Sequence, residues 1–141
     1  MRAVRRLSRI RGVEVVGQVA DVRPHLARAA VVVVPLRIAR GMQNKVLEAL
    51  AMGKAVVCSP QALVGLGAQP GVQLLSASTE QEWAAAIRSL FDDEALRQRL
   101  ATAGRGYVEE NHRWERCLEP LESVLGLTNE VLQGAACESW R

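Results

Sequence analysis

A short segment of this chain combines a glycine turn, two basic side chains and a carboxylate. It runs Arg40-Gly41-Met42-Gln43-Asn44-Lys45 and continues as an apolar helical pattern that contains Glu48. Glycine lets the backbone approach a ligand closely, and the first N–H groups of a helix attract phosphate together with the positive end of the helix dipole. A basic side chain in the first turn opposes that dipole, and a bound anion would relieve the opposition. The residue types therefore indicate a phosphate-binding turn.

The neighbouring elements place this turn at one end of a parallel sheet. Val31–Val34 is a continuous β-branched run, which is typical of a strand buried on both faces. A helix then begins at Gln43 or Asn44 and is stopped by Gly53, and Ala55–Cys58 is a second buried strand. A helix that begins at the carboxyl end of a parallel strand points its free N–H groups into the crevice where phosphates bind.

The rest of the chain alternates strand and helix patterns. The predicted elements are an N-terminal helix, strands at 13–16, 31–34, 55–58 and 72–75, and helices at 24–30, 44–52, 79–90, 92–107 and 114–125. Residues 60–71 are expected to form a loop, and Gly104 and Gly106 to weaken the end of their helix. This order predicts an α/β fold, a Rossmann-like parallel sheet with flanking helices and right-handed crossovers. Residues 1–126 are expected to form the domain and residues 127–141 a tail.

The core of the turn helix is similar to a known family. Its sequence Lys-Val-Leu-Glu-Ala-Leu-Ala-Met-Gly-Lys resembles the donor-binding core of GT-B glycosyltransferases, in particular the retaining, family 4-like enzymes (glycosyl transferases group 1) that carry a Glu-x7-Glu motif. Val13–Val22 resembles that family's strand and glycine loop, and Gly53–Ser59 resembles its Gly-Lys-Pro-Val-Val strand. The resemblance implies part of the C-terminal half of a GT-B fold, truncated at its N-terminus, with the acceptor-binding domain missing.

The same resemblance implies roles for individual residues. Glu48 would accept hydrogen bonds from the ribose hydroxyls of a nucleotide sugar, although a surface position or an ion pair with Lys45 stays open. Arg40 stands where the motif has its first Glu, so the resemblance carries over no catalytic residue and leaves Arg40 as the candidate at that position. Its guanidinium could bind a phosphate or a sugar acid, or simply lie on the surface. The remaining candidates are Gly41, Met42, Gln43, Asn44 and Lys45 at the diphosphate, and Gly17, Gln18 and Val19 at the nucleobase.

The implied function is transfer of a sugar from a nucleotide-diphosphate donor to a glycan, lipid-linked or polysaccharide acceptor. In this family catalysis relies on positioning the donor and stabilising the departing diphosphate, so we expect no metal and no other cofactor. The chain should be inactive alone, because the acceptor site would lie in the missing domain. Two alternatives stay open: a non-catalytic module that binds a nucleotide or phosphorylated ligand, and a scaffold that binds nothing.

The charge distribution bears on the partners. Residues 1–54 hold 11 Lys and Arg against three acids, a balance of +8, whereas residues 55–141 hold seven against 12, a balance of −5. A positive field attracts the phosphates of a nucleotide or of an anionic membrane surface. The basic half contains no Phe, Tyr or Trp, so the stacking platforms that single-stranded nucleic acids need are missing. We therefore expect a nucleotide sugar as ligand and no nucleic acid, and peripheral membrane contact stays open.

Three further features bear on location and assembly. No apolar run reaches the ~18–20 residues of a membrane span, and no apolar segment of a signal peptide follows the N-terminal arginines. Cys58, Cys117 and Cys137 lack a Cys-x-x-Cys pairing and are typical of reduced thiols. These features favour the cytoplasm, with the inner membrane face as an open alternative. The missing early strands would expose a sheet edge, through which a homodimer is expected.

Overall fold

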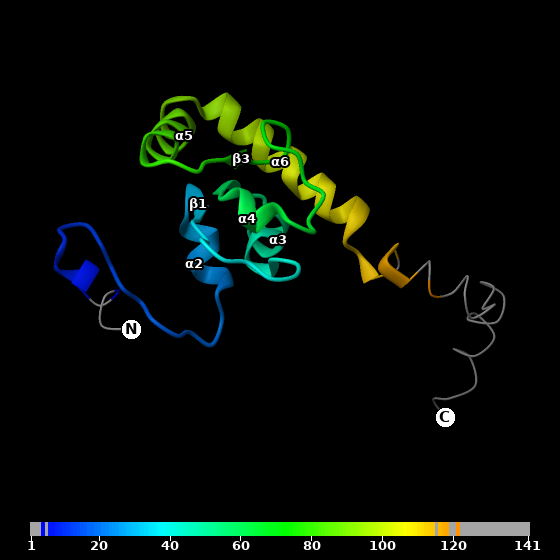
Figure 1. The fold of residues 1–141 in the computed structure, drawn as a ribbon, viewed down its shortest axis with the longest axis horizontal. Coiled ribbons are helices and arrows are strands. Elements are labelled where there is room, and N and C mark those ends of the chain that lie inside the picture. Colours follow the sequence, from blue (N-terminus) through cyan, green and yellow to red (C-terminus); the bar gives the residue numbers. More distant parts are fainter. Residues whose placement is uncertain (1–3, 5, 115, 119–120, 122–141) are drawn as a thin grey trace.

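The computed structural model describes residues 4, 6–114, 116–118 and 121 of the 141-residue chain. The described elements are η1 (Leu7–Arg9), α2 (Arg23–Arg28), β1 (Val31–Val34), α3 (Asn44–Ala51), β2 (Ala55–Cys58), α4 (Pro60–Leu63), β3 (Leu75–Ser76), α5 (Glu80–Asp92) and α6 (Glu94–Asn111). The strands form one parallel sheet in the order β1-β2-β3, with helices packed around it (Figure 1). The predicted Rossmann-like α/β class is therefore confirmed.

β2 is the centre of the sheet and is buried along its whole length. Successive side chains of a strand point to opposite faces. Val56 and Cys58 belong to a core cluster with the apolar face of α3, whereas Ala55 and Val57 belong to a second cluster with α5 and α6. The two clusters explain why an uninterrupted apolar run forms this strand, because both of its faces are covered.

β1 lies at an edge of the sheet and is only partly covered. Val34 is 5% exposed, but Val33 is 40% exposed. The prediction that this strand is buried on both faces is therefore wrong at Val33. In the described part of the chain, no strand pairs with the outer side of β1.

Residues 13–16 do not form the expected first strand. Val13 is 40% exposed and Val16 is 47% exposed, and the segment pairs with none of the three described strands. In Figure 1 the blue N-terminal segment extends away from the sheet before it returns to α2. A β-branched run becomes a strand only where a neighbouring backbone satisfies its N–H and C=O groups, and the described residues provide no such neighbour here.

Between residues 60 and 76 the structure differs from the prediction at two element boundaries. The predicted loop begins with the short helix α4, because Pro60 suits the first turn of a helix. β3 begins at Leu75 rather than at residue 72. The preceding backbone is held in turns, in which the N–H of Gln73 donates to the carbonyl of Gln69 (3.2 Å) and that of Gly71 donates to the carbonyl of Leu74 (2.7 Å).

The helices largely follow their predicted signals. α5 begins with the predicted capping box, in which the Glu82 N–H donates to Thr79 Oγ1 (3.3 Å) and the Glu82 carboxylate accepts from the Thr79 N–H (3.3 Å). Backbone N–H groups from Ser78 and Thr79 lower the pKa of Glu82. α2 ends at Arg28, slightly before the predicted end, and α3 begins at Asn44 as predicted.

α6 continues to Asn111 through both of its glycines, past the predicted end at residue 107. Most of the predicted helix at 114–125, the whole expected tail, and Arg2 and Arg5 of the predicted N-terminal helix lie outside the described residues. Within the described residues no helix has both the length and the apolarity that crossing a bilayer requires.

Candidate functional site

The turn before α3 is fixed by its own side chains. Gly41 has φ of 64°, in the left-handed region that favours glycine. The side-chain amide Nε2 of Gln43 donates to the carbonyl oxygens of Arg40 (3.1 Å) and Gly41 (3.0 Å). These two bonds satisfy the carbonyl groups of the turn and hold its shape from within the chain.

The backbone N–H groups at the start of α3 are unengaged. Among the hydrogen bonds of the described residues, none is donated by the backbone N–H of Met42, Gln43, Asn44 or Lys45. No side chain caps this end of α3, and its first turn contains no acidic residue. Because the chain enters α3 from the carboxyl end of β1, these N–H groups and the positive end of the dipole lie at the sheet end where phosphates bind.

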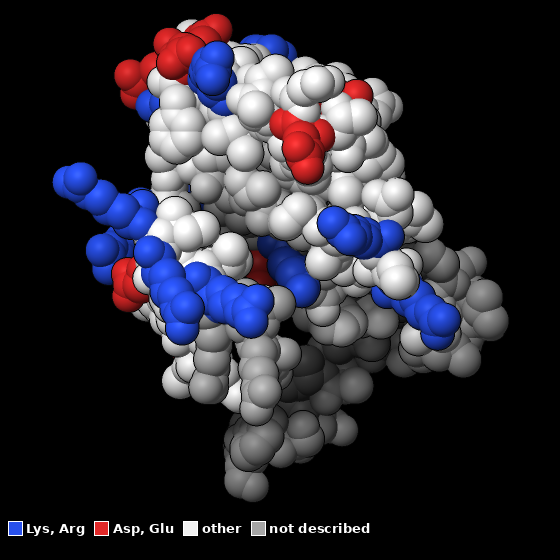
Figure 2. Space-filling model, turned by 60° about the vertical axis from the view of Figure 1, so that its left-hand side comes forward, with Lys and Arg blue, Asp and Glu red and all other residues white. Residues whose placement is uncertain are grey.

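Basic side chains flank this row of N–H groups. Arg40 and Lys45 are exposed, and neither forms an ion pair with any described residue. More broadly, Figure 2 shows Lys and Arg in a band across the middle of one face, with most of the acidic side chains of that face above it. The turn thus combines free donors with positive charge, which is the combination that binds an anion.

Glu48 lies further along α3 and lines a groove. The groove has a volume of about 400 Å³ and is lined by Ala20, Asp21, Val22, Arg23, Leu26, Glu48, Ala51 and Met52. The Glu48 carboxylate makes no hydrogen bond or ion pair with the described residues, so the alternative of an ion pair with Lys45 is not observed.

Asp21, on the other wall of this groove, is engaged. Its carboxylate pairs with Arg23 at 2.9 Å, and Arg23 lowers the pKa of Asp21 through hydrogen bonds. Of the two carboxylates that line the groove, Glu48 is therefore the one whose oxygens are available to a ligand.

The candidate nucleobase residues lie just before this groove. Gly17, Gln18 and Val19 are exposed, and Gly17 has φ of 81°. Ala20, the next residue, shares the groove with Glu48. Residues 17–19 themselves do not line this groove, and among the described residues no hydrogen bond joins them to the turn at 40–44.

Sequence reasoning missed a second cavity, at the carboxyl ends of all three strands. This strand-exit cavity has a volume of about 350 Å³ and is lined by Pro35, Leu36, Arg37, Ser59, Gln61, Ala77, Ser78, Glu80 and Trp83. The sequence contains one indication of this cavity, which is that polar residues follow each strand. The carboxyl ends of parallel strands meet at one edge of a sheet, so these residues come together there.

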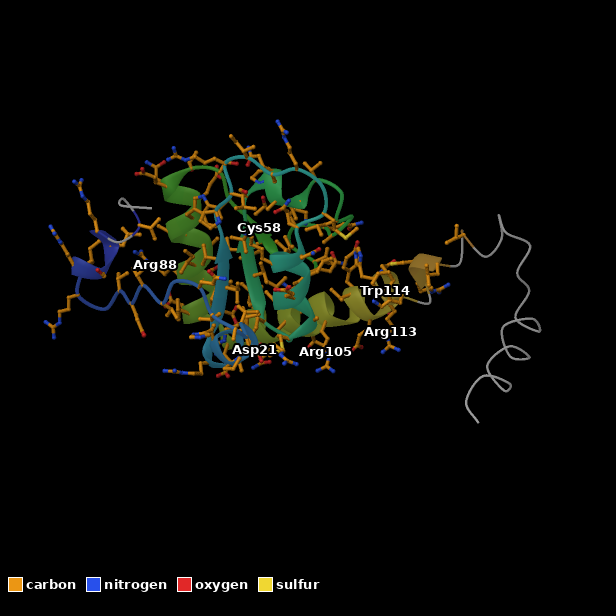
Figure 3. The ribbon with its side chains drawn as sticks, turned by 90° about the horizontal axis from the view of Figure 1, so that it is seen from below. Asp21, Cys58, Arg88, Arg105, Arg113 and Trp114 are labelled. Carbon is orange, nitrogen blue, oxygen red and sulfur yellow. The ribbon has the colours of Figure 1, made fainter. Side chains whose placement is uncertain are left out.

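Metal ligands and a cysteine thiol are the other groups that could carry chemistry. No group of three or more His, Cys, Asp or Glu among them could hold a metal ion. Cys58 is buried at the end of β2, in the interior of the domain (Figure 3), and burial raises the pKa of its thiol to about 11. This thiol stays protonated near neutral pH and is a poor nucleophile.

Comparison with known proteins gives one family. A family model described as glycosyl transferases group 1 matches residues 1–93, and this span includes the turn, Glu48, the groove and the strand-exit cavity. No curated protein matches the chain significantly. The match covers well over half of the 141 residues, and the parallel α/β sheet agrees with one part of a GT-B glycosyltransferase fold. The chain therefore belongs to the glycosyl transferases group 1 family.

Proposed function

We propose that this chain binds the nucleotide diphosphate of a sugar donor, with the diphosphate at the start of α3 and the nucleoside in the groove beside Glu48. Membership of the family supports glycosyl transfer in general. The observation that carries the finer proposal is the row of backbone N–H groups from Met42 to Lys45, none of which donates to a described acceptor. A diphosphate supplies both the negative charge and the acceptor oxygens that such a row requires.

In this proposal, Glu48 binds the ribose of the nucleoside. The two hydroxyl groups of a ribose are donors, and a carboxylate accepts from both. Lys45 and Glu48 are three residues apart on α3, a rise of about 4.5 Å along the helix, so a ribose linked to a diphosphate at the turn can reach Glu48. The groove beyond it, with Ala20 and the preceding residues 17–19, takes the base.

Arg40 and Lys45 complete the proposed donor site. An Arg guanidinium binds a phosphate or a carboxylate in a bidentate manner, so Arg40 contacts the terminal phosphate or an acidic sugar. Together with the N–H row, these two cations stabilise the diphosphate as it leaves. In this proposal the acceptor, a glycan or a lipid-linked or polysaccharide chain, is held by another domain, and this chain alone has no transferase activity.

A thermal-shift panel with UDP, GDP and ADP tests the proposal. We expect one of the three to raise stability, by about 2.7 kcal/mol at a hundredfold excess over Kd. Glu48→Gln should weaken binding of that nucleotide by about 1–3 kcal/mol, because the ribose hydroxyls lose an ionised acceptor. The matched control is Glu110→Gln, an exposed glutamate on α6 that lines neither cavity.

Other outcomes would separate the alternatives. If Glu48→Gln and Glu110→Gln bind the nucleotide equally well, the ribose assignment is wrong. If pyrophosphate binds as tightly as every nucleotide, the chain is a phosphate-binding module without nucleoside recognition. If no ligand of the panel changes the stability, the donor proposal fails and the scaffold alternative remains.

A further inference from the structure

The strand-exit cavity is distinct from the proposed donor site. No residue lines both this cavity and the groove beside Glu48. Its volume of about 350 Å³ is at the lower end of the roughly 300–1,000 Å³ range of ligand sites, and it lies at the carboxyl ends of parallel strands, where ligands of open α/β sheets bind. Its position and size suit one small ligand.

The floor of this cavity is held rigidly. Ser59 is only 6% exposed, and its Oγ donates to the carbonyl of Leu36 (2.6 Å) while its N–H donates to that of Val34 (3.2 Å). On the other side, the N–H of Ala77 donates to the carbonyl of Cys58 (3.0 Å). These bonds tie the exits of the three strands together, so a ligand meets a preformed site and little ordering is needed.

Several side chains around this floor have donors and acceptors without a partner among the described residues. Arg37, Gln61 and Glu80 make no side-chain hydrogen bond or ion pair with any described residue. Arg37 and Glu80 have opposite charges but do not pair with each other, so both remain available to a ligand. Trp83 is half-buried against the core cluster of α5 and β2, and no described acceptor takes its indole N–H.

We propose that the strand-exit cavity binds a neutral saccharide ring. Each hydroxyl group of such a ring both donates and accepts, which matches the donors of Arg37, the acceptors of Glu80 and the mixed amide of Gln61. The C–H groups of the ring can pack on the exposed part of the Trp83 indole. An anion would be opposed by Glu80, and an apolar ligand would leave three polar side chains without partners.

In a glycosyl transferase, this ring is a sugar unit of the glycan being extended, other than the unit whose hydroxyl group reacts, because the proposed function places the reacting unit on another domain. The inference rests on the cavity and on the family, and it does not depend on the nucleotide proposal. The nucleotide proposal and the saccharide proposal can fail separately. Nucleotide binding is measured by its effect on stability and by the Glu48 variant, whereas saccharide binding is measured by the NMR signal of Trp83.

Tryptophan NMR tests the inference on the whole chain. The chain has three tryptophans, so ¹⁵N labelling gives three indole N–H signals, and Trp83→Phe assigns that of Trp83. The probes are the methyl glycosides of glucose, galactose and mannose, and N-acetylglucosamine. We expect at least one to shift the Trp83 signal saturably, with a Kd of roughly millimolar order, and to leave the Trp114 and Trp140 signals in place.

Two pairs of variants assign the binding to this cavity. Arg37→Ala and Gln61→Ala should each weaken the saccharide by about tenfold, because each removes a hydrogen bond to the ring. Their matched controls, Arg88→Ala on α5 and Gln98→Ala on α6, are exposed and lie outside the cavity, and should bind as the parent does.

Three results would overturn the inference. The first is a Trp83 signal that none of the four saccharides shifts. The second is an equal or larger shift with inorganic phosphate, which would make the cavity an anion site. The third is saccharide binding that survives Arg37→Ala and Gln61→Ala unchanged, which would place the ring elsewhere.

Discussion

Individual carboxylates of this chain differ in whether they already have a partner. Asp21, Glu82 and Glu109 each accept hydrogen bonds from a neighbouring residue, and the pKa of each is lowered as a result. Glu48 and Glu80 line cavities and have no such side-chain partner among the described residues. A carboxylate without an internal partner keeps its full accepting capacity for a ligand, which is the reason for assigning binding to these two.

The cysteines give a prediction at the same scale. Because Cys58 is buried with a raised pKa and Cys117 is exposed, an alkylating reagent should label Cys117 in the native protein and Cys58 only after unfolding. Peptide mass mapping after brief treatment with iodoacetamide, with and without denaturant, measures both sites in one experiment. Equal labelling of Cys58 and Cys117 under native conditions would contradict the position of Cys58 in the core.

Residue types alone indicate the turn but not the strand-exit cavity. Arg40, Gly41 and Lys45 are close in sequence, so their combination is visible before any fold is known. Arg37, Gln61 and Glu80 come from three separate segments, and they meet only because three strands end at one edge of the sheet. Predicting β3 at residues 72–75 also put its end too early, because the strand runs to Ser76, so the residues that follow it were not assigned to this edge of the sheet.

Among the elements, α6 packs against α3 through a glycine. A Cβ atom at Gly104 would lie 2.6 Å from Leu50 Cδ2 and 2.9 Å from the carbonyl oxygen of Gln73. The absence of a side chain therefore lets the two helices approach closely, and this packing compensates for the low helix propensity of glycine. The same helix contains Gly106, where a Cβ would have no neighbour within 4 Å.

These two glycines form a matched pair for mutation. Gly104→Ala should lower the free energy of unfolding by about 1–3 kcal/mol, because the new methyl group overpacks the contact with α3. Gly106→Ala should raise it by about 0.5–1 kcal/mol, because alanine favours the helix and has room. Denaturant titration of the two variants and the parent measures both changes. Changes of the same sign would refute the contact between α6 and α3.

Local signals predicted the elements that depend on local chemistry. The capping box at Thr79 and the glycine that stops α3 are complete within a few residues, so the sequence was sufficient. The run at residues 13–16 suits a strand equally well by residue type, yet a strand needs a partner backbone, which depends on tertiary contacts. Similarly, the sequence alone indicates that Gly104 disfavours the helix, and only the tertiary contact with Leu50 shows why a glycine is suited to this position.

At the scale of the whole molecule, the sheet has an open edge. β1 pairs with β2 on one side only among the described strands, and Val33 on it is 40% exposed. An edge strand with free N–H and C=O groups can pair with another copy of itself.

We predict that two copies of the chain associate through β1. Light scattering should show a dimer, and Val33→Lys should shift the chain to monomer, because a lysine on an edge strand opposes pairing. Ile38→Lys is the control, since Ile38 is 82% exposed in the following loop and should not alter the association. A parent chain that is monomeric at working concentration would contradict this prediction.

The proposed donor site depends above all on the start of α3, which would bind the diphosphate of the sugar donor. The most direct measurement is an amide ¹⁵N–¹H NMR titration of the chain with the nucleotide diphosphate that the thermal panel selects. The backbone signals of Met42, Gln43, Asn44 and Lys45 should shift together and saturate at a single Kd, because their N–H groups take the phosphate oxygens as acceptors. If the nucleotide binds and these four signals stay in place, the diphosphate lies elsewhere and the start of α3 is not the donor site.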